Sequence, residues 1–299
     1  MKLAVITDEI DSDLGHALDV MAEYGVQGAE LRQLWDKNIA EAPREYWQRA
    51  KKELDARGMV VAGIASPFYK CALPGVEPEG PAGPLHSASA RGLGDQIAVL
   101  ERSLEAAEFF GTTLVRTFSF WKHGLLTPTQ EEAIVDAYAE PAAMAERAGV
   151  TLGIENEHAC CLGTGAQTAR VLAQIASPFV CAIWDPGNAL MDGEHPFPTG
   201  YEAIREFVVH VHIKDAAVPP GATSPVWTVV GEGEIDYAGQ FAALRRDGYT
   251  GWLSLETHYN GHPTKEASSR ACLEGLSRLL QLSPISQLSS NSQLSSKGN

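Results

Sequence analysis

The chain has 299 residues, of which 38 are acidic and 23 are basic, so its formal net charge at pH 7 is −15. A surface of this charge repels polyanions, and we therefore expect no nucleic acid as a partner. Hydrophobic residues make up 44% of the chain and charged residues 20%, which is typical of a folded domain and excludes a wholly disordered chain. No apolar run reaches the about 18 residues that suggest a transmembrane helix, so we expect no membrane partner either.

The cysteines and the first residues of the sequence bear on the cellular compartment. Five cysteines form an odd set without a CxxC pair, which favours neither a disulfide framework nor a zinc-thiolate site. The opening segment is short, soon acidic and strand-like, and it lacks the long apolar core of a secretory signal. We therefore expect a cytoplasmic protein.

Strand-like and helix-like segments alternate along the sequence. Eight short segments rich in Val, Ile, Leu and Thr predict strands over residues 3–8, 28–32, 60–66, 113–119, 151–157, 180–185, 208–214 and 251–257. Apolar residues at three- and four-residue spacing predict helices over residues 13–24, 43–57, 94–110, 128–148, 164–176, 236–246 and 264–280, with a short sixth crossover near 201–206.

Strict alternation of strands and helices predicts an α/β fold with a parallel sheet. Eight such units favour closure into a single (β/α)8 TIM barrel, which we assign to residues 1–282. An open doubly wound sheet is the alternative, but no glycine-rich GxGxxG turn follows the first strand. Residues 283–299 are rich in Ser, Gln and Asn without periodicity, and they predict a disordered tail.

Four of the later strands end in polar residues that a packed core does not favour. These residues are Glu155, Asp185, His212 and Glu256. Side chains alternate along a strand, and the apolar neighbours of these residues occupy the opposite face. In a barrel the apolar face meets the helices, so the polar side chains are expected to point inward. They lie toward the carboxyl ends of their strands, where barrel active sites are built.

Three carboxylates that meet in one barrel mouth repel one another unless a cation lies between them. Three oxygen ligands and one imidazole suit a divalent ion such as Mn²⁺, Mg²⁺ or Co²⁺, and also permit Zn²⁺. The pattern therefore predicts one divalent metal ion held by Glu155, Asp185, His212 and Glu256. The alternative is that each residue forms a separate salt bridge or helix cap.

The sequence around these residues resembles a known family. The strings IEN at Glu155, WDPGN at Asp185, HVHIKD at His212 and SLETH at Glu256 are similar to those of the sugar phosphate isomerase/epimerase family, the xylose isomerase-like barrels. The resemblance covers about residues 1–280. It implies a metal-binding barrel that acts on a small sugar-like molecule.

Departures from particular branches of that family narrow the prediction. The endonuclease branch uses additional metal-binding histidines on earlier strands, and residues 60–66 and 113–119 contain none. Ketose epimerases carry a second Glu, a His and an Arg where this sequence has Cys161, Asn188 and Val218. Lys214, two residues after His212, is similar to a lysine of dehydratase members such as 3-dehydroshikimate dehydratase.

Four further residues are candidates for substrate binding: Asn188, Lys214, Arg116 and His158. Lys214 shares the inward face with His212, where an ammonium can stabilise an enolate oxygen. Arg116 can bind a carboxylate or phosphate through two hydrogen bonds, or it can be a buried partner of Glu30 or Glu155. The amide of Asn188 can reach a substrate hydroxyl or cap a turn, and His158 can carry a proton or lie exposed.

Together these patterns predict a metal-dependent isomerase or epimerase of a small sugar or sugar-like polyhydroxy carbonyl compound. Glu155 and Glu256 are the expected catalytic pair, which removes a proton α to the carbonyl and returns it through an enediolate. The alternative is a lyase, a dehydratase of the inosose or 3-dehydroshikimate type that uses the same metal site. A sugar-binding barrel without catalytic activity is a more distant alternative. The expected partner is a small molecule, and both a monomer and a homo-oligomer fit the sequence.

Overall fold

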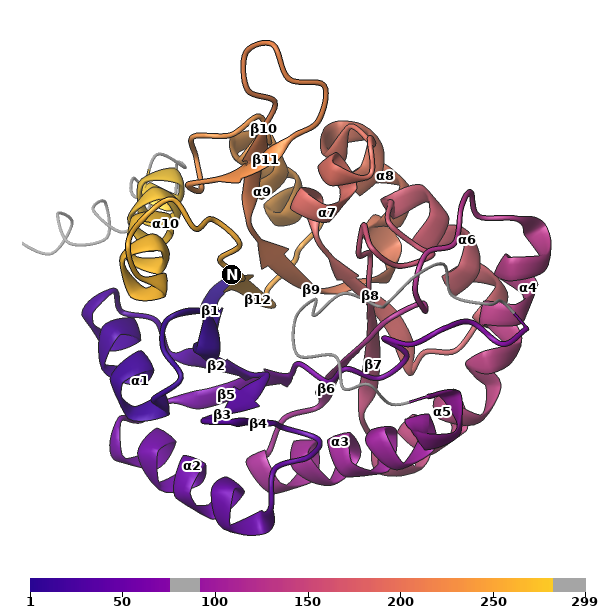
Figure 1. Cartoon of the computed structure of the whole chain (residues 1–299), viewed down its shortest axis with the longest axis horizontal. Helices are drawn as coiled ribbons and strands as arrows, with labels where there is room; N and C mark the ends of the chain where they lie inside the picture. Colours follow the sequence, from indigo (N-terminus) through magenta and orange to yellow (C-terminus); the bar gives the residue numbers. More distant parts are fainter. Residues whose placement is uncertain (76–91, 282–299) are drawn as a thin grey trace, which may run out of the picture.

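The computed structural model describes residues 1–75 and 92–281 of the chain. Eight parallel strands form a closed barrel in the order β1-β12-β9-β8-β7-β6-β5-β2 (Figure 1). Their bounds are Lys2–Ile6 for β1, Gly28–Leu31 for β2, Val60–Ile64 for β5, Leu114–Thr117 for β6, Thr151–Glu155 for β7, Val180–Trp184 for β8, Val208–Ile213 for β9 and Trp252–Leu255 for β12. The predicted (β/α)8 barrel and its eight strands are confirmed, whereas the predicted tail, residues 283–299, lies outside the described residues.

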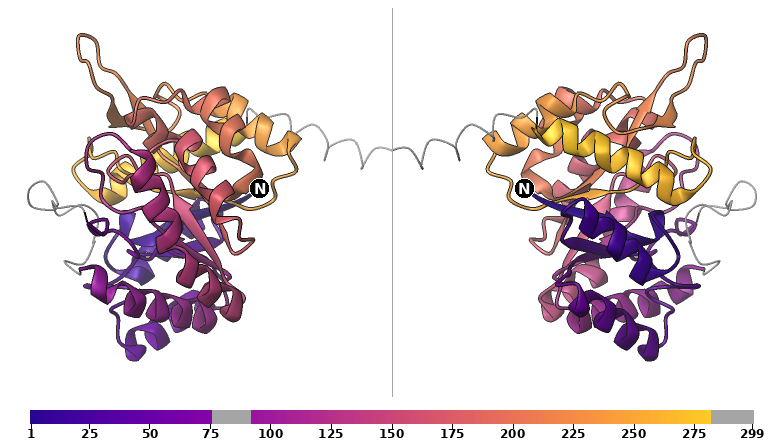
Figure 2. Two further views of the ribbon diagram at one scale, coloured as in Figure 1. Left: turned by 90° about the vertical axis from the view of Figure 1, so that its right-hand side faces the viewer. Right: turned by 90° about the vertical axis from the view of Figure 1, so that its left-hand side faces the viewer.

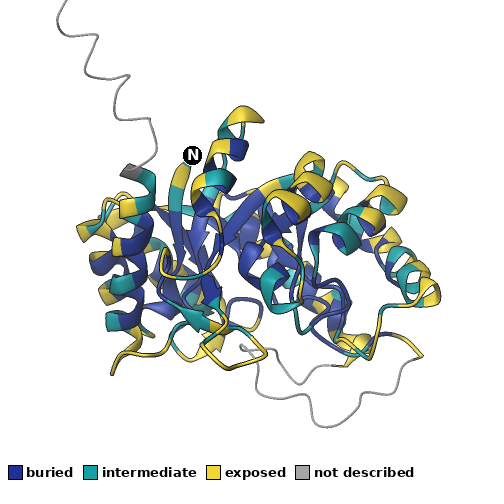
Figure 3. Cartoon of the chain, turned by 90° about the horizontal axis from the view of Figure 1, so that it is seen from above, coloured by how far each residue is buried: buried dark blue, intermediate teal, exposed yellow. Residues whose placement is uncertain are grey.

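Helices surround the barrel and cover the apolar outer face of its strands (Figure 1). The α-helices are α1 (Leu14–Glu23), α2 (Arg44–Ala56), α3 (Gln96–Phe110), α4 (Pro128–Ala137), α5 (Ala139–Ala148), α6 (Gly165–Ile175), α7 (Pro186–Met191), α8 (Tyr201–Ile204), α9 (Tyr237–Arg246) and α10 (Lys265–Gln281). The short sixth crossover is confirmed as α8. Most residues of the barrel strands are buried between these helices and the barrel interior, and the exposed ones lie near the amino ends of the strands (Figure 3).

The single helix expected over residues 128–148 is wrong, because the structure divides it into α4 and α5 at Tyr138. Proline has no backbone N–H, so Pro141 cannot donate to the carbonyl of Ala137 four residues earlier. The carbonyl of Ala137 instead accepts a hydrogen bond from the hydroxyl of Tyr69 at 2.7 Å. One proline therefore breaks the helix, and the carbonyl oxygen that loses its helical hydrogen bond accepts one from a neighbouring loop instead.

Residues 186–191 form α7, a helix that was not among those predicted from the sequence. Asp185 is the N-cap of this helix, and its Oδ1 accepts a hydrogen bond from the backbone N–H of Asn188 at 2.8 Å. Proline in the first helical turn costs no hydrogen bond, because N–H groups at that position have no partner within the helix. The chain therefore enters a helix directly from the end of β8.

Two short hairpins lie outside the barrel sheet. Strands β3 (Gln33–Leu34) and β4 (Lys37–Asn38) follow β2, and strands β10 (Asp215–Ala217) and β11 (Val226–Thr228) follow β9. The loop between β10 and β11 projects from the molecule (Figure 2). Neither pair was expected as strands, because each is too short to show a periodic pattern.

The last helix closes the ring of helices against the first. Helices α1 and α10 are neighbours in the ring (Figure 1). His16 of α1 lies 2.9 Å from Glu266 of α10, and Arg270 of α10 pairs with Glu23 of α1 at 2.6 Å. No helix in the described part of the chain is long and apolar enough to cross a membrane. All five cysteines are free thiols.

One glycine fixes the position of α10. A Cβ atom added at Gly275 would lie 1.8 Å from the carbonyl oxygen of Val230, a buried backbone atom that cannot rotate away. We expect Gly275→Ala to lower the free energy of unfolding by roughly 1–3 kcal/mol, the usual cost of overpacking. Gly94→Ala is the matched control, because no atom lies within 4 Å of the added methyl group. Denaturant unfolding of both variants measures the difference, and equal stabilities would contradict the predicted close contact.

Candidate active site

Four side chains predicted from the sequence to converge do meet in the barrel mouth. Glu155 is the last residue of β7, Asp185 follows β8, His212 lies near the end of β9, and Glu256 follows β12. One oxygen or nitrogen atom from each lies within 4.8 Å of those of the other three. All four side chains are buried. The predicted convergence is confirmed, and the role of these residues as metal ligands remains a prediction.

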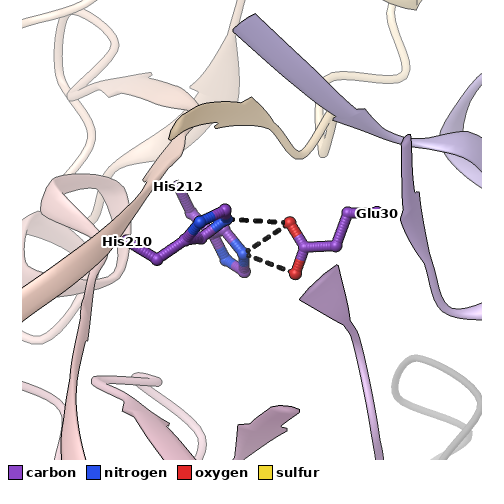
Figure 4. Close-up of side chains that lie close together, drawn as sticks. All are labelled: Glu30, His210 and His212. Carbon is purple, nitrogen blue, oxygen red and sulfur yellow. Dashed lines mark hydrogen bonds and ion pairs between the residues drawn. The ribbon is translucent and has the colours of Figure 1, made fainter. Parts of the chain in front are cut away.

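The imidazole of His212 lies between three carboxylates on one side and the carboxylate of Glu30 on the other. Its Nδ1 is 3.1 Å from Glu155 Oε1, 3.5 Å from Glu256 Oε2 and 3.9 Å from Asp185 Oδ2. Its Nε2 is 3.2 Å from both carboxylate oxygens of Glu30, which extends from β2 across the barrel (Figure 4). Burial alone would lower the pKa of His212, but the carboxylates of Glu30 and Glu155 outweigh it and raise that pKa well above its usual value.

Lys214 lies among the same carboxylates, as its inward-facing position on the sequence predicts. Its Nζ is 2.6 Å from Glu256 Oε2, 2.9 Å from Asp185 Oδ2 and 3.8 Å from Glu155 Oε1. A Cβ atom at Gly187 would lie 2.6 Å from Lys214 Cγ, so the glycine of the WDPGN string leaves room for this side chain. The ammonium therefore neutralises part of the negative charge that the sequence predicts here.

Two buried arginines add positive charge at the edge of the cluster. Arg116, from β6, donates to Glu155 Oε2 at 3.2 Å and to Glu256 Oε1 at 3.4 Å. Arg32 donates to Glu256 Oε1 at 3.3 Å, and it also pairs with Asp8 at 2.8 Å. Arg116 was predicted as a site residue, whereas Arg32 was not.

Asn188 contacts the cluster directly, and His158 contacts Asn188 on the side away from Glu155. Asn188 Nδ2 donates to Glu155 Oε1 at 3.1 Å, and its Oδ1 lies 2.9 Å from Nδ1 of His158. His158 also lies 2.9 Å from the carboxylate of Glu157. Burial lowers the pKa of His158, but Glu157 and Asn188 outweigh it and raise that pKa above its ordinary value. A chain of polar contacts thus runs from the metal-ligand candidates to a half-buried histidine.

A residue that the sequence analysis missed joins two strand ends. The side-chain amide of Asn156 donates to the carbonyl of Asp185 at 2.8 Å, and its oxygen accepts from the N–H of Asp185 at 2.8 Å. This pair of hydrogen bonds fixes the backbone at the end of β8 relative to β7. The sequence signal for it is its place as the last residue of the IEN string, directly after Glu155.

Aromatic and acidic side chains line the space above the cluster. Trp227, on β11, lies 5.4 Å from Lys214 Nζ and 4.9 Å from the ring of His258. A cavity of about 590 Å³ adjoins the cluster, and its walls include Asp8, Glu9, Arg32, Trp227 and His258. Its size suits a small molecule.

The donor set fits a divalent cation. Burial raises the pKa of Asp185 to about 7, and the carboxylates of Glu155 and Glu256 add to this effect against the opposing effect of Lys214. Asp185 is completely buried, and its Oδ2 forms an ion pair with Lys214 Nζ at 2.9 Å without a hydrogen bond of good geometry from the described residues. Three carboxylates with one imidazole are ligands that Mn²⁺, Mg²⁺, Co²⁺ and Zn²⁺ all accept.

The comparison with known families agrees with this architecture. Residues 18–278 match the model of the xylose isomerase-like TIM barrel family, and the chain belongs to that family.

Curated relatives match a smaller part of the chain. The inosose dehydratase of Lacticaseibacillus casei is 27% identical over 112 residues, which cover 32% of this chain and 37% of that protein. A match to the inosose dehydratase of Geobacillus thermodenitrificans covers 46% of this chain and 50% of that protein at 25% identity. The chain thus spans half or less of the length of these relatives.

Solved structures share the fold over nearly the whole chain. A probable 3-DHS dehydratase from Bacillus anthracis has a TM-score of 0.71 at 17% identity, with 93% of this chain and 99% of that chain covered. A 3-keto-D-glucoside 4-epimerase from E. coli has a TM-score of 0.69 at 16% identity, with 94% of this chain and 100% of that chain covered. The IOLI protein, whose structure contains a zinc atom, has a TM-score of 0.70 at 15% identity, with 94% of this chain and 99% of that chain covered.

Metal binding by this cluster is expected to weaken as the pH falls. A carboxylate or imidazole must be deprotonated to bind a metal, and both Asp185 and His212 have raised pKa values in the metal-free protein. A divalent ion therefore releases protons when it binds, and we expect its affinity to fall by about tenfold or more between pH 8 and pH 6. Titration calorimetry in two buffers of different ionisation enthalpy measures both the affinity and the released protons. An affinity that is constant over this range would contradict the assignment of these two side chains.

Proposed function

We propose that the protein is a divalent-metal-dependent isomerase or epimerase of a small sugar or sugar-like polyhydroxy carbonyl compound. The observation that carries the proposal is the convergence of Glu155, Asp185, His212 and Glu256, all buried, in the barrel mouth. The geometry supports these four as the residues that hold one ion, with Mn²⁺, Mg²⁺ or Co²⁺ favoured and Zn²⁺ permitted. When bound, such an ion supplies a Lewis acid that polarises a carbonyl oxygen of the substrate.

Glu155 and Glu256 are the proposed proton-transfer pair. Burial would raise the pKa of each, but His212 and Arg116 outweigh it at Glu155, and Lys214 outweighs it at Glu256, so both pKa values lie below the usual value for glutamate. Both carboxylates are therefore ionised at neutral pH and able to accept a proton. One removes the proton α to the carbonyl, and the other returns a proton to a neighbouring carbon or to the opposite face.

Four residues around the pair are proposed to bind and orient the substrate: Asn188, Lys214, Arg116 and His158. The ammonium of Lys214 contacts Asp185 and Glu256, so its charge is available where negative charge develops on a substrate oxygen. Trp227 offers an apolar face above Lys214, against which the C–H face of a sugar-like ring can pack. The adjoining cavity of about 590 Å³ has room for a compound of this size.

A dehydratase is the second candidate function. Lys214 Nζ lies 2.6 Å from Glu256 Oε2, which places an ammonium proton beside a carboxylate that can remove a substrate proton. In a lyase, the carboxylate takes the C–H proton and an acid protonates the departing hydroxyl group, which leaves as water. Inosose dehydratases among the curated relatives favour the same chemistry.

The catalytic pair is tested by Glu155→Gln and Glu256→Gln, which keep the size of the side chain and remove its ability to accept a proton. Each is expected to lower kcat by at least the roughly 10²–10⁴-fold that is typical of general acid–base catalysis. Steady-state kinetics with the metal supplied in excess provide the measurement. Glu132→Gln is the control, since Glu132 is exposed on α4, does not line the cavity and is expected to leave kcat unchanged. Normal turnover in both glutamine variants would remove these residues from the mechanism.

The type of reaction is tested by product analysis in D₂O with a panel of ketoses, inososes and 3-dehydroshikimate. An isomerase or epimerase is expected to yield a product that keeps the formula of the substrate and gains deuterium at the carbon that was deprotonated. A lyase yields a product lighter by one water. Lys214→Ala is expected to lower kcat more than it raises KM, because its charge acts on the developing enolate.

The outcomes of these experiments distinguish an isomerase, a lyase and a sugar-binding barrel without catalytic activity. Loss of water together with a collapse of kcat in Lys214→Ala would replace the isomerase with the lyase. Tight binding of a panel member without any conversion, in the presence of metal, would instead support a sugar-binding barrel.

A further inference from the structure

A second buried cluster lies directly beneath the proposed metal site. Glu30, His210 and His212 are all completely buried, and Figure 4 shows the carboxylate of Glu30 directed at both imidazole rings. Glu30 comes from β2 and the two histidines come from β9, so the contact crosses the interior of the barrel. Neither Glu30 nor His210 belongs to the proposed ligand set, and the proposed chemistry gives them no role.

The backbone of β2 aims Glu30 inward. The register between β2 and β5 shifts between Ala29 and Glu30, so that Ala29 pairs with Val61 while Glu30 pairs with Gly63. Irregularities of this kind redirect a side chain and tend to lie close to active sites. The partner at this position, Gly63, has no side chain to compete for the interior of the barrel.

The two ring nitrogens of His212 face different groups. Nδ1 faces the cluster, 3.1 Å from Glu155, whereas Nε2 faces Glu30 at 3.2 Å. A neutral imidazole that binds a metal through Nδ1 must carry its proton on Nε2, and that proton needs an acceptor. Glu30 is the acceptor that the structure places there.

His210 holds Glu30 in this position. Its Nε2 lies 3.0 Å from Glu30 Oε2, and its ring stands at 84° to that of His212 with the centroids 5.3 Å apart. Within the described residues, Nδ1 of His210 has no hydrogen-bond partner, so Nε2 is the nitrogen that donates. The carboxylate of Glu30 thus accepts hydrogen bonds from two imidazole rings of the same strand.

We propose that Glu30 is a positioning residue, which holds the Nε2 proton of His212 and thereby leaves Nδ1 as the ring atom presented to Glu155, Asp185 and Glu256. This inference rests on the proposed function, because it assigns Glu30 a purpose at the metal site. A carboxylate behind a metal-binding histidine fixes the tautomer and orientation of the ring, and its loss typically weakens metal affinity by 10–100-fold.

The proposal is tested with Glu30→Leu and Glu30→Gln, compared with the wild-type protein. Leucine removes the acceptor, and we expect its metal affinity to be about 100-fold weaker, whereas glutamine keeps a carbonyl acceptor and is expected to lose only about tenfold. Competition with a chelator, using Mn²⁺ or Zn²⁺ alone, measures the affinity. Glu194→Gln is the matched control, because Glu194 caps α6 through the N–H groups of Gly165 and Ala166 and has no contact with the site. It is expected to change stability without changing metal affinity.

A second measurement does not depend on metal. In metal-free protein, the Nε2–H of His212 is expected to give a slowly exchanging ring N–H resonance, identified by its loss in His212→Gln, and Glu30→Gln is expected to shift it upfield. This measurement requires only a folded variant, so it serves if Glu30→Leu fails to fold. Wild-type protein that binds no divalent ion would defeat the proposed function, while the resonance would still decide the role of Glu30.

Three results would overturn the inference. The first is a folded Glu30→Leu protein with wild-type metal affinity. The second is a His212 ring resonance that Glu30→Gln leaves unchanged. The third is a wild-type protein that binds two ions per chain and loses one of them in His210→Gln, because Glu30 would then be a metal ligand and not a hydrogen-bond acceptor.

Discussion

The balance of charge inside the barrel is the constraint on which this structure depends. Glu30, Glu155, Asp185 and Glu256 are buried in one barrel interior, and Lys214 lies within 3 Å of two of them. Two arginines complete the balance, with Arg116 joining Glu155 to Glu256 and Arg32 joining Glu256 to Asp8. Removing one member of such a network leaves an uncompensated buried charge, which is strongly destabilising. Because the charges come from strands all round the barrel, the site is complete only when the sheet is closed.

Much of the fold could be predicted from the sequence because its signals are local. Strands and helices follow from periodicities of two and about 3.6 residues, and the polar strand ends follow from alternation within single strands. The break between α4 and α5 was missed although Pro141, in the first turn of α5, marks it. The hairpin of β10 and β11 was missed because its strands have three residues each.

The contacts of the site could be predicted only in part, because they join distant strands. The convergence of Glu155, Asp185, His212 and Glu256 follows from the parallel order of the strands. The reach of Glu30 to β9 depends on a shift of register that leaves no trace in the sequence. The reaction is a still harder inference, since a probable 3-DHS dehydratase and an epimerase share this fold with TM-scores of 0.71 and 0.69.

The position of Trp227 has a consequence for how proteins of this kind diversify. This indole stands over Lys214, yet it belongs to β11, which pairs with β10 in a separate two-stranded sheet and not with the eight strands of the barrel. Insertions, deletions or exchanges in that hairpin can reshape the wall above the reactive groups while every hydrogen bond of the barrel sheet is kept. The residues proposed to carry the chemistry and the residue proposed to meet the ligand therefore lie on parts of the chain that evolution can alter separately.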